Sequence, residues 1–324
     1  MINLILRRLL QSAVVLLVMS LLVFIAVYAI GDPIALLVDP QADQRDIARV
    51  RASLGLDAPW WAQYGHFLAA AGRGDLGQTF THGEPAIRLV LARMPATLEL
   101  ASAALLIALV AGVPLGLWAG LRPNSLSARL VNGLALLGFS LPTFWVGMML
   151  IMLFAVGLGW LPTGGRGPTE PVFGMPLSIT GIEGWRHLLL PAVTLALFKW
   201  SLLLRLTAGA TREAMRQDYV RFARARGLFP ARIVGVHVLK NILIPIVTVS
   251  GLEFGSLIAF AVVTETVFAW PGMGKLLIDA IAVLDRPVVV AYLLITVALF
   301  VAINLVVDLL YALLDPRVRL GSAA

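Results

Sequence analysis

The chain has 324 residues, of which 60% are hydrophobic and 13% are charged, and its mean hydropathy is +0.91. This composition excludes an ordinary soluble domain and is typical of an integral membrane protein. The formal net charge of +7 comes from short basic blocks between apolar stretches, which favours membrane topology over nucleic-acid binding. Because the sequence has no cysteine, it excludes disulfides, thiolate metal sites and a cysteine nucleophile.

Six apolar stretches are long enough to cross roughly 30 Å of hydrocarbon as helices, which takes about 20 residues each. The first follows Arg7 and Arg8, is too long for a signal-peptide core, and is interpreted as an uncleaved span. The third is long and contains Pro142, which predicts a kink or a separate short helix. The chain is thus predicted to be all-α, with spans at residues 9–30, 97–119, 130–158, 188–208, 241–263 and 288–310.

Basic residues near the span ends predict that both termini are cytoplasmic. The first external segment contains Trp60 and Trp61 in a weakly amphipathic stretch, followed by a glycine-rich turn, and is expected to form a small extracytoplasmic cap. The expected organisation is a cytoplasmic N-terminus and first helix at 1–30, the external segment at 31–96, a five-helix core at 97–320 with a cytoplasmic loop at 209–240, and a tail at 321–324.

Small residues recur at four-residue spacing in two spans. Gly112, Gly116 and Gly120 form such a series in the second span, and Gly251 and Gly255 in the fifth. This spacing predicts close helix packing, because small residues let backbones approach each other.

Opposite charges lie about halfway through consecutive spans, at Lys199 and Glu253. A charge in hydrocarbon is costly unless it is paired or faces water, so two interpretations are open. One is a buried ion pair that fixes helix register, and the other is a polar patch on a translocation path for a zwitterionic solute. Glu99, near the end of its span, is interpreted as interfacial.

The sequence lacks the nucleotide-binding and hydrolase motifs that would indicate an enzyme. The nearest approach to a Walker A phosphate loop, at 269–276, lacks the first glycine and the hydroxyl residue. No H-E-x-x-H or G-x-S-x-G pattern occurs, and the four histidines are isolated from one another. A transport subunit without catalytic residues, bound cofactor or metal is therefore favoured over a membrane-embedded enzyme.

The charged segment at 211–245 separates two very apolar stretches and is predicted to form helix, stop and helix. Met215, Tyr219 and Phe222 fall at i, i+4 and i+7, which predicts one apolar stripe with the arginines lying away from it. Gly227 predicts the end of the first helix, and a proline three residues later favours a new start. The pattern fits either a docking surface or a basic loop lying on membrane lipid.

Within this segment, DYVRFARARGL at 218–228 and HVLKNILIP at 237–245 resemble the dipeptide, oligopeptide and nickel permeases of bacterial ABC importers. Of the E-A-A-x-x-x-G pattern of their coupling loop, the chain keeps Ala223 and Gly227. Further similar stretches follow in the family's order: LGLDAPWWAQY (54–64), GDLGQTF (74–80), PATLEL (95–100), FSLPTFWVG (139–147), HLLLPAVTLAL (187–197), ETVFAWPGMG (265–274) and NLVVDLLYALLDPRVRL (304–320).

The resemblance implies a type I ABC importer permease fold in the bacterial inner (cytoplasmic) membrane. It implies a homologous second permease subunit, an extracytoplasmic solute-binding protein, and two cytoplasmic ATPase subunits that carry ATP and Mg²⁺. The chain would form half of the import pathway. Without cysteine or clustered histidine it offers no dedicated metal site, which favours peptides over nickel or a metal chelate as the solute.

The resemblance also assigns expected roles to residues. The cytoplasmic loop would dock on the ATPase as a coupling helix through Met215, Tyr219, Arg221, Phe222, Ala223, Arg224 and Gly227. The stretch at 264–277 is too apolar for an ordinary external loop, and is expected to form either a plain turn or an outer gate with Phe268, Trp270 and Pro271. An alternative function is a self-sufficient secondary transporter that uses Lys199, Glu253 and Glu99 as an ion or proton relay.

Overall fold

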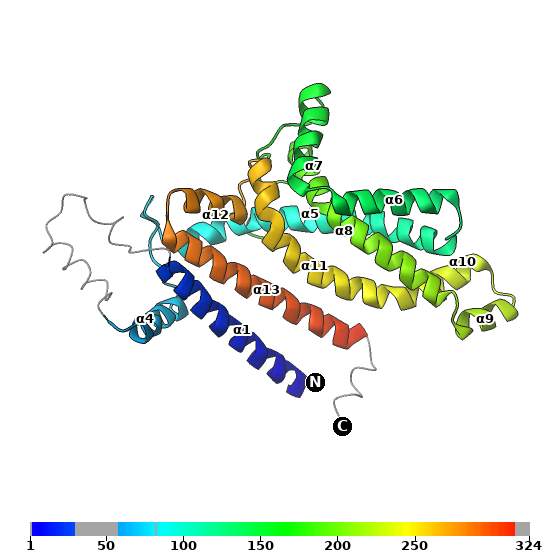
Figure 1. Ribbon diagram of the computed structural model, residues 1–324, viewed down its shortest axis with the longest axis horizontal. Helices are drawn as coiled ribbons and strands as arrows, with labels where there is room; N and C mark the ends of the chain where they lie inside the picture. Colours follow the sequence, from blue (N-terminus) through cyan, green and yellow to red (C-terminus); the bar gives the residue numbers. More distant parts are fainter. Residues whose placement is uncertain (1, 30–57, 82, 315–324) are drawn as a thin grey trace, which may run out of the picture. The chain divides into compact units, whose positions relative to one another are not determined.

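The structure is a computed structural model that describes residues 2–29, 58–81 and 83–314 (Figure 1). The described residues are mostly helical, with one two-stranded antiparallel hairpin, β1–β2. The elements are α1 (Ile2–Ala29), α4 (Trp60–Gly72), α5 (Ala86–Leu121), α6 (Leu126–Ser140), α7 (Thr143–Leu150), η1 (Ile151–Gly157), β1 (Glu170–Val172), β2 (Met175–Leu177), α8 (Ile182–Ala214), α9 (Asp218–Ala225), α10 (Pro230–Arg232), η2 (Ile233–Val238), α11 (Leu239–Val267), α12 (Met273–Ala282) and α13 (Arg286–Leu314).

Among the described residues, five helical segments are long and apolar enough to cross a membrane. A bent pair, Leu126–Ser140 and Thr143–Gly157, makes a sixth if its two arms count as one span. These segments confirm the predicted apolar spans. The five are Leu6–Ala26, Ala86–Leu121, Ile182–Ala214, Pro230–Val267 and Arg286–Leu309.

The third predicted span is broken, with a bend of 105° between its two arms. Leu141 has an extended backbone and Pro142 precedes the first residue of α7. Proline lacks an N–H and disfavours the helical conformation in the residue before it, so the break falls where the sequence predicted a kink.

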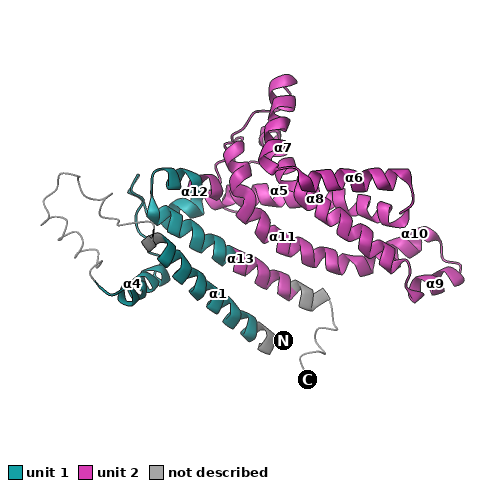
Figure 2. Cartoon of the chain, viewed as in Figure 1, with its two compact units in different colours: residues 1–92, 277–299 teal, residues 93–276, 300–324 magenta. Residues whose placement is uncertain are grey.

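The chain forms two compact units, residues 1–92 with 277–299 and residues 93–276 with 300–324 (Figure 2). In the first unit, Asp285 precedes α13 and is buried. Its carboxylate accepts hydrogen bonds from the Thr79 hydroxyl and from the Phe80 N–H, the latter at 3.1 Å. These bonds hold the segment 79–80 against the start of α13.

In the second unit, the glycines of α5 lie against α8. A Cβ added at Gly116 would lie 2.7 Å from the Cβ of Thr207, and one at Gly120 would lie 2.6 Å from the Cβ of Thr211. On α11, a Cβ at Gly255 would lie 2.6 Å from the Phe300 ring. The close packing predicted from the glycine spacing is confirmed.

Candidate functional site

Helix α9 ends at Ala225, and the predicted stop lies just beyond it at Gly227. Gly227 has a φ of +74° and donates to the Arg224 carbonyl at 2.9 Å, while the Leu228 N–H donates to the Ala223 carbonyl at 3.2 Å. These two bonds form the Schellman arrangement that closes a helix when the next residue adopts a left-handed conformation. A Cβ added at Gly227 would meet nothing within 4 Å, so the backbone angle is what favours glycine here within this chain.

The inner face of α9 packs inside the chain. Val220 and Ala223 are buried in a cluster that also contains residues from the end of α8, from η2 and from α11, and Met215 packs against it. The full buried set is Ala214, Val220, Ala223, Ile233, Val238, Ile242 and Ile246. The α9 helix is therefore attached to both long helices that flank it.

The predicted single stripe of Met215, Tyr219 and Phe222 is wrong. Helix α8 ends at Ala214, and Gln217 has an extended backbone before α9 begins. Because the helix is interrupted, the i, i+4, i+7 relation does not carry across the turn. Met215 and Ala223 lie at the internal cluster, whereas Tyr219 and Phe222 are exposed.

The outer face of the α9 segment combines aromatic rings with arginines. Phe222 is 60% exposed, and the Arg226 guanidinium lies 4.5 Å from the centroid of its ring. Arg221 and Arg224 are also exposed. Phe229, which the sequence analysis missed, is 79% exposed at the residue before α10. The sequence signal that could have identified Phe229 was its position between the helix stop at Gly227 and Pro230.

Lys199 of α8 and Glu253 of α11 form an ion pair, as one of the two interpretations predicted. The Lys199 ammonium also donates to the Ser256 hydroxyl at 2.7 Å, and that hydroxyl donates to the Glu253 carboxylate at 2.9 Å. Lys199 is buried, and the Glu253 side chain is 23% exposed. The pair thus connects the two helices that also hold α9.

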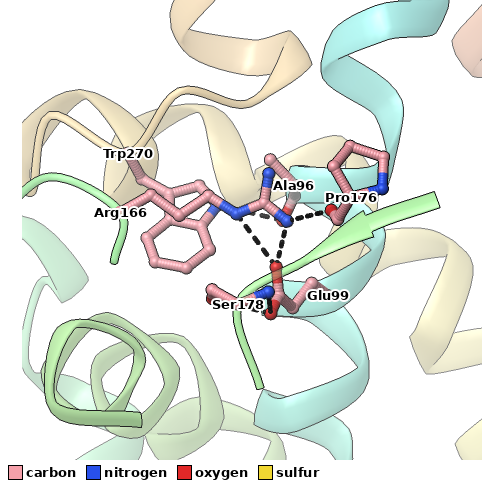
Figure 3. A network of polar contacts seen from close by, with 6 residues as sticks. All are labelled: Ala96, Glu99, Arg166, Pro176, Ser178 and Trp270. Carbon is pink, nitrogen blue, oxygen red and sulfur yellow. Dashed lines mark hydrogen bonds and ion pairs between the residues drawn. The ribbon is translucent and has the colours of Figure 1, made fainter. Parts of the chain in front are cut away.

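Glu99 is buried in a polar network rather than interfacial, so that interpretation is wrong (Figure 3). Its carboxylate pairs with Arg166 and accepts 2.7 Å hydrogen bonds from both the N–H and the hydroxyl of Ser178. Arg166 also donates to the Pro176 carbonyl at 2.6 Å. The loop between η1 and α8 folds over Glu99, and this places β2 against α5.

A second buried carboxylate, Glu265, stands near the end of α11. It accepts hydrogen bonds from the Thr97 hydroxyl at 2.6 Å and from the Lys275 N–H at 2.9 Å. The Thr97 hydroxyl in turn accepts from the Met273 N–H at 2.8 Å. Met273 and Lys275 lie in the first turn of α12, whose N–H groups have no partners within the helix. No sequence pattern predicts a role for Glu265 or Thr97, although both lie in stretches that resemble the permease family.

The predicted outer-gate residues lie in the same turn. Phe268 and Trp270 are buried inside the chain, and Pro271 is half-buried. Trp270 donates from its indole N–H to the Ala96 carbonyl at 2.9 Å, and the Arg166 guanidinium lies 5.7 Å from the centroid of its ring (Figure 3). The Phe268 and Trp270 rings therefore pack as core side chains of a tight turn within the chain.

Comparison with known families agrees with this architecture. Residues 112–320 match the family described as "Binding-protein-dependent transport system inner membrane component", and residues 1–101 match the N-terminal part of such membrane components. A chain of the MetNI methionine ABC transporter, solved in an inward-facing conformation, has a similar fold, with a TM-score of 0.56 and 19% identity. The match covers 72% of this chain and 99% of that one.

Curated relatives are similar over most of their length. The di/tripeptide transport system permease protein DppB of Pseudomonas aeruginosa is 44% identical, covering 89% of this chain and 90% of the relative. The dipeptide permease protein DppB of Escherichia coli K12 and the glutathione permease protein GsiC of Salmonella typhimurium are each 38% identical, covering 98% of this chain and 99% of the relative. The chain therefore belongs to the family of binding-protein-dependent transport system inner membrane components, as a multi-pass permease of the bacterial inner membrane.

Proposed function

We propose that the chain is the permease subunit of an ATP-driven importer of di- or oligopeptides and forms half of the translocation pathway. Its similarity to relatives named for di-, tripeptide and glutathione transport supports the peptide class, because it extends over nearly the whole chain. The chain itself performs no catalysis in this proposal. ATP and Mg²⁺ are bound by two cytoplasmic ATPase subunits.

The observation that carries the coupling proposal is the two-sided packing of α9. Its outer face presents Phe222 to the surroundings, while its inner face is buried against α8 and α11. A partner that holds the outer face and moves would displace both helices, since close-packed elements shift as units. We infer that the partner is the ATPase and that α9 and both termini face the cytoplasm.

The remaining partners follow from the family description, which specifies dependence on a binding protein. We infer an extracytoplasmic solute-binding protein and a homologous second permease subunit that completes the pathway. Lys199 and Glu253 are assigned to helix register rather than to solute binding, because each finds its charge partner within the chain. A third polar group, Ser256, completes the arrangement.

The test uses the complete transporter in proteoliposomes, with uptake of a radiolabelled dipeptide measured with ATP and in the presence or absence of vanadate. Uptake that depends on ATP and stops with vanadate is expected. For docking, Phe222→Ala is expected to weaken ATPase co-purification about tenfold, the effect of losing roughly 1.4 kcal/mol at an interface hot spot. Phe173→Ala removes an exposed ring from the turn of the β1–β2 hairpin and serves as the control.

Two results would contradict the proposal separately. Uptake driven by a proton gradient without ATPase subunits would remove the ABC assignment. Unchanged ATPase co-purification with Phe222→Ala, together with normal ATP-driven uptake, would remove only the docking assignment.

A further inference from the structure

Helix α4 belongs to a stretch with no charged side chain. Residues 58–72 contain no Asp, Glu, Lys or Arg, and the next charged residue is Arg73, directly after α4. No residue of α4 is buried within the chain. An uncharged helix with this much exposed surface lies in either water or lipid, and its contacts within the chain indicate which of the two surrounds it.

The α4 helix lies beside α1 (Figure 1). Tyr64 and Phe67 make the ring contacts between the two helices. The Tyr64 hydroxyl lies 2.9 Å from the Ser20 hydroxyl and donates to the Leu17 carbonyl at 3.1 Å. The Phe24 ring centroid lies 5.4 Å from that of Tyr64 and 5.7 Å from that of Phe67. These contacts fix which part of α1 lies beside α4.

That part of α1 is the middle of its membrane span. Arg8 is the last charged residue before the uncharged stretch of 9–30, and the apolar span runs over Leu6–Ala26. At about 1.5 Å per residue, Ser20 lies roughly 18 Å along the helix from Arg8, near the centre of a hydrocarbon layer about 30 Å thick. Since α1 crosses the membrane there, the Tyr64 side chain reaches the same depth.

The polar groups at this contact satisfy one another, as lipid requires. Ser20 donates to the Leu17 carbonyl at 2.8 Å, and the Tyr64 hydroxyl bonds the same carbonyl. On another side of α4, the Gln63 amide donates to the Ala58 carbonyl at 2.7 Å. An unpaired polar group costs several kcal/mol in hydrocarbon, so this pairing suits a lipid environment and is not needed in water.

We propose that α4 is embedded in the lipid leaflet beside the C-terminal half of α1, instead of forming part of a water-exposed cap. Its outward stripe is Trp61, Gly65, Ala69 and Gly72, one residue on each successive turn, and this stripe contacts acyl chains. Trp61, 62% exposed, supplies the large apolar side chain of the stripe. Gln63 and His66, three residues apart on a different stripe, face the headgroup region.

Embedding gives α1 a neighbour within the bilayer. Only 11% of the most apolar window of α1 is buried inside the chain, and among the described residues α4 packs against α1. A lipid-embedded α4 shields the Ser20 hydroxyl and packs aromatic rings along the helix. The position of α4 in the bilayer does not depend on the proposed solute or ATPase.

The absence of cysteine allows a direct test with single-cysteine variants of the full chain in the complete transporter. Trp61→Cys and Ala69→Cys are spin-labelled in liposomes, and relaxation by oxygen, which partitions into lipid, is compared with relaxation by water-soluble chromium oxalate. A spin-labelled phospholipid is the hydrocarbon reference. Glu170→Cys, on the exposed edge of β1, is the water reference.

Both α4 labels are expected to give an oxygen-to-chromium-oxalate ratio close to that of the lipid label and several-fold above that of Glu170→Cys. A ratio equal to that of the water reference would overturn the proposal. Low accessibility to both reagents would also overturn it, because another protein subunit would then cover the stripe. Having two labelled positions keeps the test valid if Trp61→Cys disturbs folding.

Discussion

The Glu265 carboxylate accepts a 2.6 Å hydrogen bond from the Thr97 hydroxyl, although 168 residues separate the two in sequence. The two side chains together receive the N–H groups of Met273 and Lys275. They therefore complete the first turn of α12 and tie the end of α11 to α5.

Thr97→Val keeps the shape of the side chain but removes its hydroxyl. The Met273 N–H and one Glu265 oxygen then lose their partner inside the protein, and we expect a loss of about 1 to 3 kcal/mol in stability. The measurement is the midpoint of thermal unfolding of the purified transporter in detergent. Thr97→Ser, which retains the hydroxyl, should unfold close to wild type, and equal loss in both variants would contradict the capping role.

Reversing the Lys199–Glu253 pair tests its assignment to helix register. Either single change, Lys199→Glu or Glu253→Lys, places two like charges together between α8 and α11 and should destabilise the chain by about 3 kcal/mol or more. The double variant should regain most of the thermal stability and should import the same dipeptide. Regained stability with altered solute preference would instead place the pair on the pathway.

Gly116→Ala is expected to destabilise the α5–α8 contact. Its Cβ would lie 2.5 Å from the Leu204 carbonyl oxygen, so the helices must separate, at a cost of about 1 to 3 kcal/mol. Gly133→Ala in α6 is the matched control, because a Cβ there meets nothing within 4 Å. The control should be neutral or stabilising by about 0.5 to 1 kcal/mol, since alanine favours a helix. Thermal unfolding compares the two.

Gly227→Asn separates docking from folding. Asparagine tolerates the left-handed conformation, and nothing in the chain lies within 4 Å of the new Cβ, so membrane insertion and thermal stability should change little. ATPase co-purification should fall, because the added side chain stands on the proposed docking surface. Gly74→Asn, at a φ of +77° and also with open space around it, is the control and should leave ATPase binding unchanged.

Local sequence patterns predicted the helices, and they predicted helix ends wherever a single residue type determines the backbone conformation. Apolar runs marked the spans, Pro142 marked the break and Gly227 marked the stop. The end of α8 was missed because no glycine or proline stands at Met215 to Gln217, and that omission produced the wrong stripe on α9. The β1–β2 hairpin was also missed, since its turn places Phe173, a residue that rarely adopts positive φ, at +51°.

The buried carboxylates could not be placed from sequence because their partners are distant along the chain. Glu99 meets Arg166 and Ser178 only after the loop before α8 folds over α5. A charge near the end of an apolar run gives the same sequence signal whether it faces headgroups or a buried arginine. The Lys199–Glu253 pair was easier to predict, since two opposite charges at equal depth on consecutive spans have few other partners.

The bend at Leu141 and Pro142 also determines the sidedness of every later segment. Each arm has 15 residues and is about 22 Å long, shorter than a hydrocarbon layer of roughly 30 Å, so neither arm crosses alone as a straight helix. If the two arms make one crossing together, four crossings precede α9, and α9 emerges on the same face as the start of α1. If the two arms instead turn back to the face they came from, only three crossings precede α9. In that case α9 lies on the opposite face from the start of α1. A cytoplasmic N-terminus and an ATPase bound at α9 are thus compatible only when this broken helix counts as a full passage through the membrane.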